Sequence, residues 1–331
     1  MMRGKWLAAL GVPFALGLAS AGYQTAGMTR DRRRFPPPGE LIDVGGRRLH
    51  MWREGSGTPP VVLIPALGGP AAEWADVQHE LAVVTTVCVY DRAGLGWSDG
   101  GPLVPATPGR MADDLHRLVD AARIPRPFVL AGHSVGGLAA RMYAARHPGD
   151  LAALVLIDSS HEDQFWRLRE NDPWEGAHEL WLRAARSRLT PLGLVRLADR
   201  LGVADGRRRG VAYSYPSGFT EAGLAFSLSS KQRRADICEL LGFALGMAEV
   251  RRTAGSLRAL PLLVIAGGPK GRERWYRGWA ELQREFAGLS SRSTQRVADH
   301  SGHHLHRDAP DVVIRGIENL VEKLRAEAQH R

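Results

Sequence analysis

The sequence contains few cysteines, and no internal repeat or low-complexity tract is apparent in it. Only Cys88 and Cys238 occur among 331 residues, which is too few for a disulfide framework. Cys88 falls within a predicted buried strand, so we do not expect the two to be cross-linked. Hydrophobic residues make up 44% and charged residues 24% of the chain, which is typical of a globular protein and excludes a disordered or fibrous one.

A strong charge excess is also missing from most of the chain. The net charge is +9, but six basic residues and one acidic residue within residues 1–34 contribute +5 of it, which leaves +4 for the rest. A nucleic-acid-binding surface requires a clustered excess of basic residues. We therefore expect no nucleic-acid partner.

The N-terminal region, residues 1–39, contains a long uncharged segment and a proline-rich linker. Trp6 to Tyr23 follow the basic residues Arg3 and Lys5 and are long enough to cross a bilayer as a helix. Two interpretations stay open: a retained membrane anchor, or a signal peptide whose residues 19–21 offer small side chains for cleavage. The sequence thus predicts either a cell-membrane protein with a single N-terminal anchor, its topology open, or an exported protein.

From residue 40 onward, short apolar runs alternate with amphipathic stretches. Predicted strands cover residues 41–44, 47–53, 61–64, 86–90, 128–131, 153–157, 262–266 and 293–298. Predicted helices cover residues 72–81, 111–122, 135–147, 275–289 and 310–328. This alternation predicts an α/β fold with a mostly parallel sheet and helices on both faces, preceded by an antiparallel hairpin that turns at Gly45–Gly46.

The alternation is interrupted over residues 159–260, where the pattern is mostly helical. We expect a helical lid here, inserted above the carboxyl ends of the strands, where open α/β sheets bind ligands. Residues 40–158 and 261–331 would then form the core. The lid's own small core is expected to contain three tryptophans, Trp166, Trp174 and Trp181.

The pattern Gly-x-Ser-x-Gly occurs twice, at residues 96–100 and 132–136. Random placement gives roughly 0.2 matches in a chain of this composition, so the context of each match decides. A nucleophilic serine in this pattern lies on a sharp turn between a buried strand and a helix. Ser134 meets both conditions, whereas Ser98 lies beyond its strand and precedes a segment rich in glycine and proline. Ser134 is therefore the predicted nucleophile, and Ser98 is interpreted as part of a loop.

Four segments together resemble the α/β-hydrolase superfamily. They occur in the family's order and span most of the chain after residue 40: VVLIPALGG (61–69), YDRAGLGWS (90–98), GHSVGG (132–137) and SGHHLHRDAP (301–310). The resemblance implies an α/β-hydrolase fold with a helical lid. It also implies a serine hydrolase of the esterase or lipase kind.

The resemblance further implies that the backbone N–H groups of Leu67 and Val135 form an oxyanion hole. Family members commonly have His-Gly where this chain has Pro65–Ala66. Because the oxyanion donors are backbone groups, this change need not abolish them.

A serine hydroxyl needs a base, and the base needs a carboxylate that orients its imidazole. His303 is the predicted base, because it lies between the last strand and the last helix and matches the family's histidine loop. Asp158, at the end of a predicted strand, is the predicted acid, and Glu273 stays open as the alternative. A zinc site would be a competing use of the histidines in this loop, but no cysteine lies nearby, and we expect no metal ligands among His300, His304 and His306.

Together these residues predict a serine hydrolase that cleaves an acyl ester through a Ser-His-Asp triad and a covalent acyl-enzyme, without a cofactor. Amide or peptide cleavage and acyl transfer use the same groups and stay open. The alternative from a different class is a binding or scaffold protein that has kept the fold and lost its activity, which the altered oxyanion loop motivates. The expected partner is a small-molecule acyl substrate, and the oligomeric state stays open.

Overall fold

The computed structural model describes residues 2–168, 173–203, 205–268 and 273–330, and the side chains of residues 17–168, 181–203, 207–268 and 276–330. A sheet of eight strands forms the centre of the molecule. The strands are β1 (Glu40–Asp43), β2 (Arg48–Glu54), β3 (Val61–Ile64), β4 (Val87–Tyr90), β5 (Phe128–His133), β6 (Leu151–Ile157), β7 (Leu262–Gly267) and β8 (Ser293–Ala298). The helices of the core are α2 (Ala75–Leu81), α3 (Pro108–Ala121), α4 (Val135–Arg146), α11 (Glu273–Ala287), α12 (Leu305–Asp308) and α13 (Pro310–Gln329).

The strand order in the sheet is β1-β2-β4-β3-β5-β6-β7-β8. β1 and β2 form an antiparallel hairpin and β2 pairs antiparallel with β4, whereas every other pair is parallel. The central strands β3 and β5 are buried along their whole length, which explains their continuous apolar sequences, because both faces of a parallel sheet are covered. The predicted α/β-hydrolase fold with a mostly parallel sheet is confirmed.

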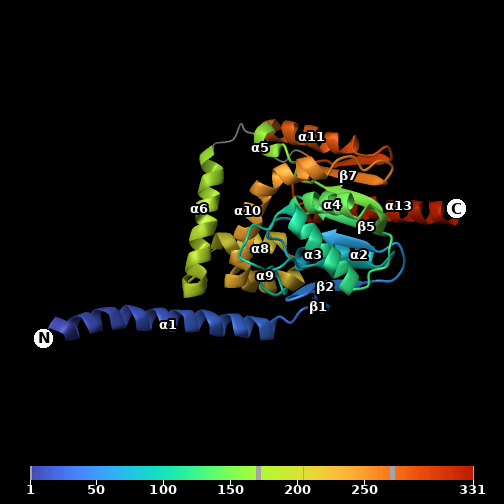
Figure 1. Ribbon diagram of the computed structural model, residues 1–331. Helices are drawn as coiled ribbons and strands as arrows, with labels where there is room; N and C mark the ends of the chain where they lie inside the picture. The colour runs from blue at the N-terminus through green and yellow to red at the C-terminus, as the bar shows by residue number, and fades with distance from the viewer. Residues whose placement is uncertain (1, 169–172, 204, 269–272, 331) are drawn as a thin grey trace.

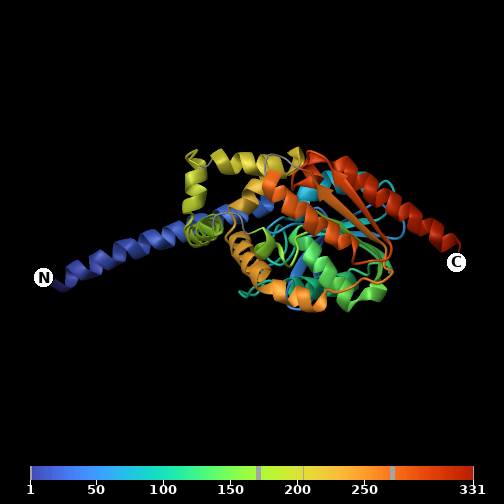
Figure 2. The ribbon, with the colours of Figure 1, turned by 90° about the horizontal axis from the view of Figure 1, so that it is seen from above.

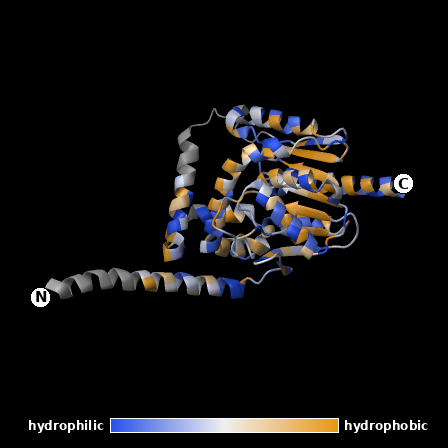
Figure 3. Cartoon of the chain, viewed as in Figure 1, coloured by the Kyte–Doolittle hydropathy of each residue, from blue (hydrophilic) through white to orange (hydrophobic). Residues whose placement is uncertain are grey.

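Alternate side chains along each strand point into two separate hydrophobic cores. In β3, Val62 and Ile64 belong to the core that contains residues of α3 and α4, whereas Val61 and Leu63 belong to the core that contains residues of α2 and α13. Figure 2 shows α13 (red) and the helices α3 and α4 (green) on opposite sides of the sheet. The strands between them are predominantly hydrophobic (Figure 3). With both faces covered, the carboxyl edge of the sheet is where a site can open.

The elements described between β6 and β7 are all helical, and we name residues 159–260 the helical insertion. Its longer helices are α6 (Pro173–Leu189), α7 (Leu194–Arg200), α8 (Asp205–Ser214), α9 (Thr220–Ser227) and α10 (Ser230–Thr253). α10 packs against α3 and α4 and so joins the insertion to the core (Figure 1).

The prediction that the tryptophans of the insertion pack in a core of its own is wrong for two of them. Trp166 and Trp181 are 67% and 65% exposed, because α6 and the short helix α5 (Gln164–Arg167) lie at the periphery of the molecule (Figure 1). The side chain of Trp174 lies outside the described residues.

Helix α1 (Met2–Arg34) precedes the sheet, and its second half contacts the helical insertion. Arg196 of α7 pairs with Asp31 at 2.7 Å and donates to Gln24 at 3.2 Å. Among residues whose side chains are described, no helix combines the length and the apolar character needed to cross a membrane. Most of the segment from Trp6 to Tyr23 lies outside those residues, so the anchor or signal peptide stays a prediction.

Candidate active site

Ser134 lies on the turn between β5 and α4. Its backbone adopts φ 54° and ψ −122°, a conformation that residues other than glycine rarely adopt. The flanking glycines have a steric reason: a Cβ at Gly132 would lie 2.4 Å from the Gly136 carbonyl oxygen, and a Cβ at Gly136 would lie 2.4 Å from that of Ile64. The sequence therefore supports a turn that presents the hydroxyl at the carboxyl edge of the sheet, beside the amino end of α4.

His303 reaches Ser134 from the loop between β8 and α12. Its Nε2 lies 3.0 Å from Ser134 Oγ, and its Nδ1 lies 2.5 Å from Asp158 Oδ2. With a proton on Nδ1, Nε2 is free to accept the proton of the serine hydroxyl. The structure thus brings together three side chains that the sequence analysis singled out, from three separate loops at one edge of the sheet.

Asp158 follows β6 directly and is 2% exposed. Its Oδ1 accepts hydrogen bonds from the Gly267 N–H and from the Trp279 indole N–H, both at 2.8 Å. The second oxygen is left to face His303, so the carboxylate has one orientation. The sequence analysis missed Trp279, because a tryptophan in an amphipathic helix usually signals only core packing. The side chain of Glu273 lies outside the described residues.

His133, next to the nucleophile, does not face Ser134 Oγ but contacts the backbone of the histidine loop. It is fully buried, and its Nε2 lies 2.8 Å from the carbonyl oxygen of His303. Burial, together with the nearby imidazoles of His303 and His306, holds the pKa of His133 well below its ordinary value, so the ring is neutral and its Nε2–H donates. This contact fixes the position of the backbone that carries the imidazole of His303.

One other histidine of this loop, His306, packs in the interior of the molecule. His306 is 2% exposed and stacks on Trp74 with ring centroids 4.8 Å apart. Burial lowers the pKa of His306 to about 3, so it is neutral at physiological pH.

Among the described side chains, the group close enough to share a metal ion lies elsewhere. It consists of His116, His147 and Asp150, near the end of α4 opposite Ser134. Asp150 already accepts a hydrogen bond from the Tyr143 hydroxyl at 2.6 Å.

A cavity of about 400 Å³ opens beside Ser134 and His303. Leu67 and Val135, whose N–H groups are the predicted oxyanion donors, both line it. Much of the remaining wall is aromatic, and it includes Phe243, Tyr276 and Trp279. Among the described residues of the wall, the only side chains of Asp, Glu, His, Lys or Arg are those of Asp158 and His303. The described part of the wall therefore favours an uncharged, largely apolar group.

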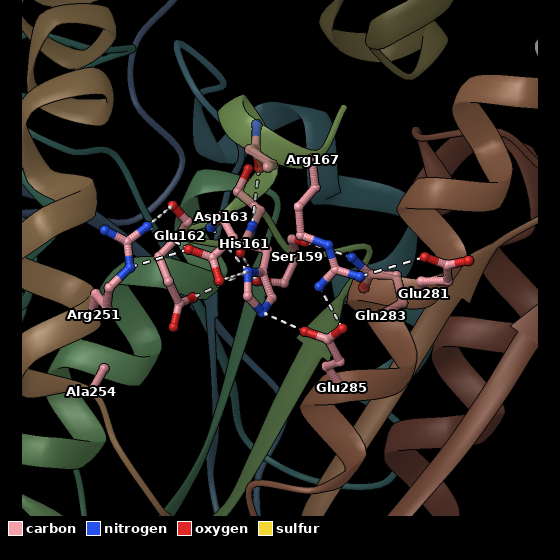
Figure 4. A network of polar contacts seen from close by, with 12 residues as sticks. Ser159, His161, Glu162, Asp163, Arg167, Arg251, Ala254, Glu281, Gln283 and Glu285 are labelled. Carbon is pink, nitrogen blue, oxygen red and sulfur yellow. Dashed lines mark hydrogen bonds and ion pairs between the residues drawn. The ribbon is translucent and has the colours of Figure 1, made fainter. Parts of the chain in front are cut away.

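The segment that follows β6 is fastened on both sides by polar contacts (Figure 4). On one side, Gln283 of α11 donates to the Ser159 carbonyl oxygen at 2.7 Å, and Arg167 forms ion pairs with glutamates of the same helix. On the other side, Arg251 of α10 pairs with Asp163. These contacts hold the start of the helical insertion next to the candidate site.

The second Gly-x-Ser-x-Gly segment has a structural role. Ser98 is fully buried and its hydroxyl donates to the Asp91 carbonyl oxygen at 2.6 Å. The Asp91 carboxylate accepts from the N–H groups of Ala71 at 2.6 Å and Trp97 at 2.9 Å, and it lies 2.8 Å from Nδ1 of His50. These groups tie two loops to β2, away from the hydroxyl of Ser134.

Comparisons with known proteins identify the fold family of the chain. A family model described as the α/β hydrolase fold matches residues 59–310. An uncharacterized protein of Schizosaccharomyces pombe is 26% identical over 250 residues, which cover 74% of this chain and 43% of that protein. The chain thus spans less than half the length of the first curated relatives it matches.

Two solved structures are similar over most of their length. A thermophilic esterase from Thermogutta terrifontis is 23% identical with a TM-score of 0.58, covering 86% of this chain and 97% of that one. An enol-lactonase from Burkholderia xenovorans is 24% identical with a TM-score of 0.60, covering 86% of this chain and 100% of that one. At these identities the likeness shows the fold alone. The family model, however, covers most of the chain and includes Ser134, Asp158 and His303, and the chain belongs to the α/β hydrolase fold family.

Proposed function

We propose that the chain is a serine hydrolase that cleaves an uncharged acyl ester. The observation that carries the proposal is the continuous hydrogen-bonded line from Ser134 Oγ through His303 to Asp158, 3.0 Å and 2.5 Å long, at the wall of a cavity. A nucleophile, a base and an orienting acid within hydrogen-bonding reach are what acyl transfer requires. Membership in a hydrolase-fold family supports the same reaction class.

In the proposed reaction, Ser134 Oγ attacks the ester carbonyl carbon while its proton passes to His303 Nε2. The negative charge that develops on the carbonyl oxygen is stabilised by the N–H groups of Leu67 and Val135. The C–O bond then breaks, and the leaving alcohol takes the proton from His303. Water repeats the sequence on the acyl-enzyme and releases the carboxylic acid and free Ser134. Asp158 stays ionised throughout and stabilises the imidazolium.

The wall of the cavity supports a substrate without charge on the part that enters it. Against the described part of the wall, a charged group would lose its hydration without a partner of opposite sign, since the carboxylate of Asp158 and the imidazole of His303 are committed to each other. The aromatic wall instead favours an apolar acyl or alcohol group. The volume of about 400 Å³ is suited to a ligand of modest size.

Labelling with a fluorophosphonate probe tests the nucleophile. We expect the wild-type chain to incorporate one probe at Ser134, identified by peptide mass spectrometry, and the Ser134→Ala variant to incorporate none. A screen of acyl esters of graded chain length, run in parallel, should show turnover that Ser134→Ala abolishes.

The matched control is Ser98→Ala, which removes the serine of the other Gly-x-Ser-x-Gly segment. We expect this variant to keep probe incorporation at Ser134 and to lose thermal stability, because it deletes two buried hydrogen bonds, one to the Asp91 carbonyl oxygen and one from the His50 N–H. A folded wild-type chain that neither reacts with the probe nor turns over any ester would contradict the proposal and favour the binding-protein alternative. Turnover of amides or transfer to added alcohols would instead revise the substrate class.

We also propose that Trp6 to Tyr23 anchor the chain in a membrane. The segment is uncharged and preceded by basic residues, as anchors and signal peptides are. Fractionation of the expressed full-length chain, with N-terminal sequencing of the product, tests this. Membrane recovery of a chain that still carries its N-terminal residues supports an anchor, and a shortened product in the soluble exported fraction refutes it.

A further inference from the structure

The loop that carries Leu67 is supported by a buried ion pair. Arg92, which follows β4, and Glu239 of α10 are 5% and 2% exposed. Two hydrogen bonds join them, from Arg92 Nε to Oε1 at 2.6 Å and from Nη2 to Oε2 at 3.0 Å. Burial alone would lower the pKa of Arg92, but Glu239 raises it above its ordinary value, so Arg92 stays charged. Bidentate pairing of this kind fixes both side chains in one geometry.

Each member of the pair also binds the backbone of the loop. Arg92 donates from Nη1 to the Pro65 carbonyl oxygen at 2.7 Å and from Nη2 to that of Ala66 at 2.6 Å. Glu239 Oε2 accepts the N–H of Gly68 at 2.7 Å. Backbone groups on both sides of Leu67 are therefore held by the ion pair.

A third side chain, Gln232 of α10, completes the support. Gln232 is 5% exposed, and its Nε2 donates to the Gly68 carbonyl oxygen at 2.9 Å while its Oε1 accepts the Gly96 N–H at 2.9 Å. Gly68 itself has φ +69°, and a Cβ there would lie 2.9 Å from Asp236 Oδ1 of the same helix. The loop and α10 thus pack in direct contact, with the polar backbone groups of the loop matched to side chains of the helix.

We propose that Arg92, Glu239 and Gln232 are positioning residues that hold the oxyanion loop in its working geometry. This support would come from side chains outside the loop, which itself has Pro65–Ala66 where family members commonly have His-Gly. The inference rests on the proposed function, since it assigns the loop a task in that reaction. Because two of the three residues belong to α10, the oxyanion hole is complete only when the helical insertion is seated on the core.

Glu239→Gln is the direct test, because it removes the charge and keeps the size of the side chain. We expect kcat to fall about 10- to 100-fold, somewhat less than the outright loss of one oxyanion donor, while KM changes little. The affinity for a trifluoromethyl ketone, which forms a tetrahedral adduct with the nucleophile, should fall by the same factor as kcat/KM. Arg92→Lys should act in the same direction, because an ammonium cannot reproduce the forked contacts.

The matched control is Glu249→Gln on the same helix. Glu249 pairs with Arg146 of α4 at 2.9 Å and, within the part of the chain that the structure describes, forms no hydrogen bond or ion pair with the loop, so its loss loosens the attachment of α10 without touching Leu67. We expect kcat and ketone affinity to stay at the wild-type level. Equal losses in Glu239→Gln and Glu249→Gln would overturn the inference, because a general loosening of the insertion would then explain both.

Hydrogen exchange at the amides of residues 66–69 supplies a readout that does not depend on turnover. We expect faster exchange there in Glu239→Gln and unchanged exchange in Glu249→Gln, and unchanged exchange in both would overturn the inference. If Glu239→Gln does not fold, Gln232→Met removes the hydrogen bond to the Gly68 carbonyl oxygen without creating a buried charge, and the same two readouts apply. A wild-type chain without turnover or probe labelling refutes the proposed function alone. The exchange result still reports whether Arg92, Glu239 and Gln232 hold the loop.

Discussion

Replacing Asp158 by asparagine changes one atom and should nearly stop the reaction. The Oδ1 position is held by two donors, the Gly267 N–H and the Trp279 indole N–H, each at 2.8 Å. An asparagine would keep its carbonyl oxygen there, because its amide nitrogen cannot accept from them. The amide N–H group would then face Nδ1 of His303. That nitrogen would have to accept, so the ring proton would move to Nε2, which could no longer take the proton of Ser134.

The size of the effect follows from this tautomer. In a serine triad the wrong tautomer costs about 10⁴-fold in kcat. At about 1.36 kcal/mol for each factor of ten, this corresponds to about 5.5 kcal/mol of transition-state stabilisation. KM should change little, because Asp158 acts through His303 rather than by holding the substrate. The fold should persist, since both donors to Oδ1 keep their acceptor.

The assay measures kcat and KM of Asp158→Asn and Glu273→Gln side by side on the best ester of the chain-length screen. We expect a large loss only for Asp158→Asn. A loss smaller than about tenfold would refute the argument from the fixed carboxylate, since the wrong tautomer allows no such residual rate. A larger loss for Glu273→Gln would move the acid to that residue.

Most of the fold follows from local patterns in the sequence. The eight strands lie within a few residues of the predicted ranges. For β3 to β7 the reason is that a buried parallel strand requires a continuous apolar run and little else does over so short a length. The turn at Ser134 is equally local, since close approach of the backbone demands glycine at residues 132 and 136. His303 and Asp158 are predictable for a related reason: each follows a strand, and parallel strands end at one edge.

The supporting contacts are not local, and the sequence analysis missed them. Arg92 and Glu239 are separated by 147 positions, and neither lies in a pattern that distinguishes a buried ion pair from a charge on the surface. Trp279 has the position of a core residue in its helix, yet it is the indole N–H that matters to Asp158. Conversely, Trp181 is of a residue type that usually packs in a core, yet it is exposed. Which side chains meet across the helical insertion depends on how its helices pack, and that information is spread over the whole chain.

Two further predictions concern groups around the site. Trp279→Phe should lower kcat about tenfold with little change in KM, because it deletes one of the two donors that fix Asp158, and steady-state kinetics on the same ester check this. Asp236→Asn should raise the melting temperature above pH 6, measured by thermal unfolding across pH. Burial, assisted by Glu239 and opposed by Arg233, raises the pKa of Asp236 from 3.8 to about 6. The folded state therefore holds the proton more tightly than the unfolded chain, and the stability contributed by this group is complete below pH 3.8 and lost as the pH rises through 6. Because asparagine cannot ionise, the variant should avoid up to about 3 kcal/mol of this loss, reduced by the contribution of the ion pair with Arg233 that it gives up. If the free energy of unfolding falls as steeply between pH 3.8 and 6 in the variant as in the wild type, the assignment is refuted.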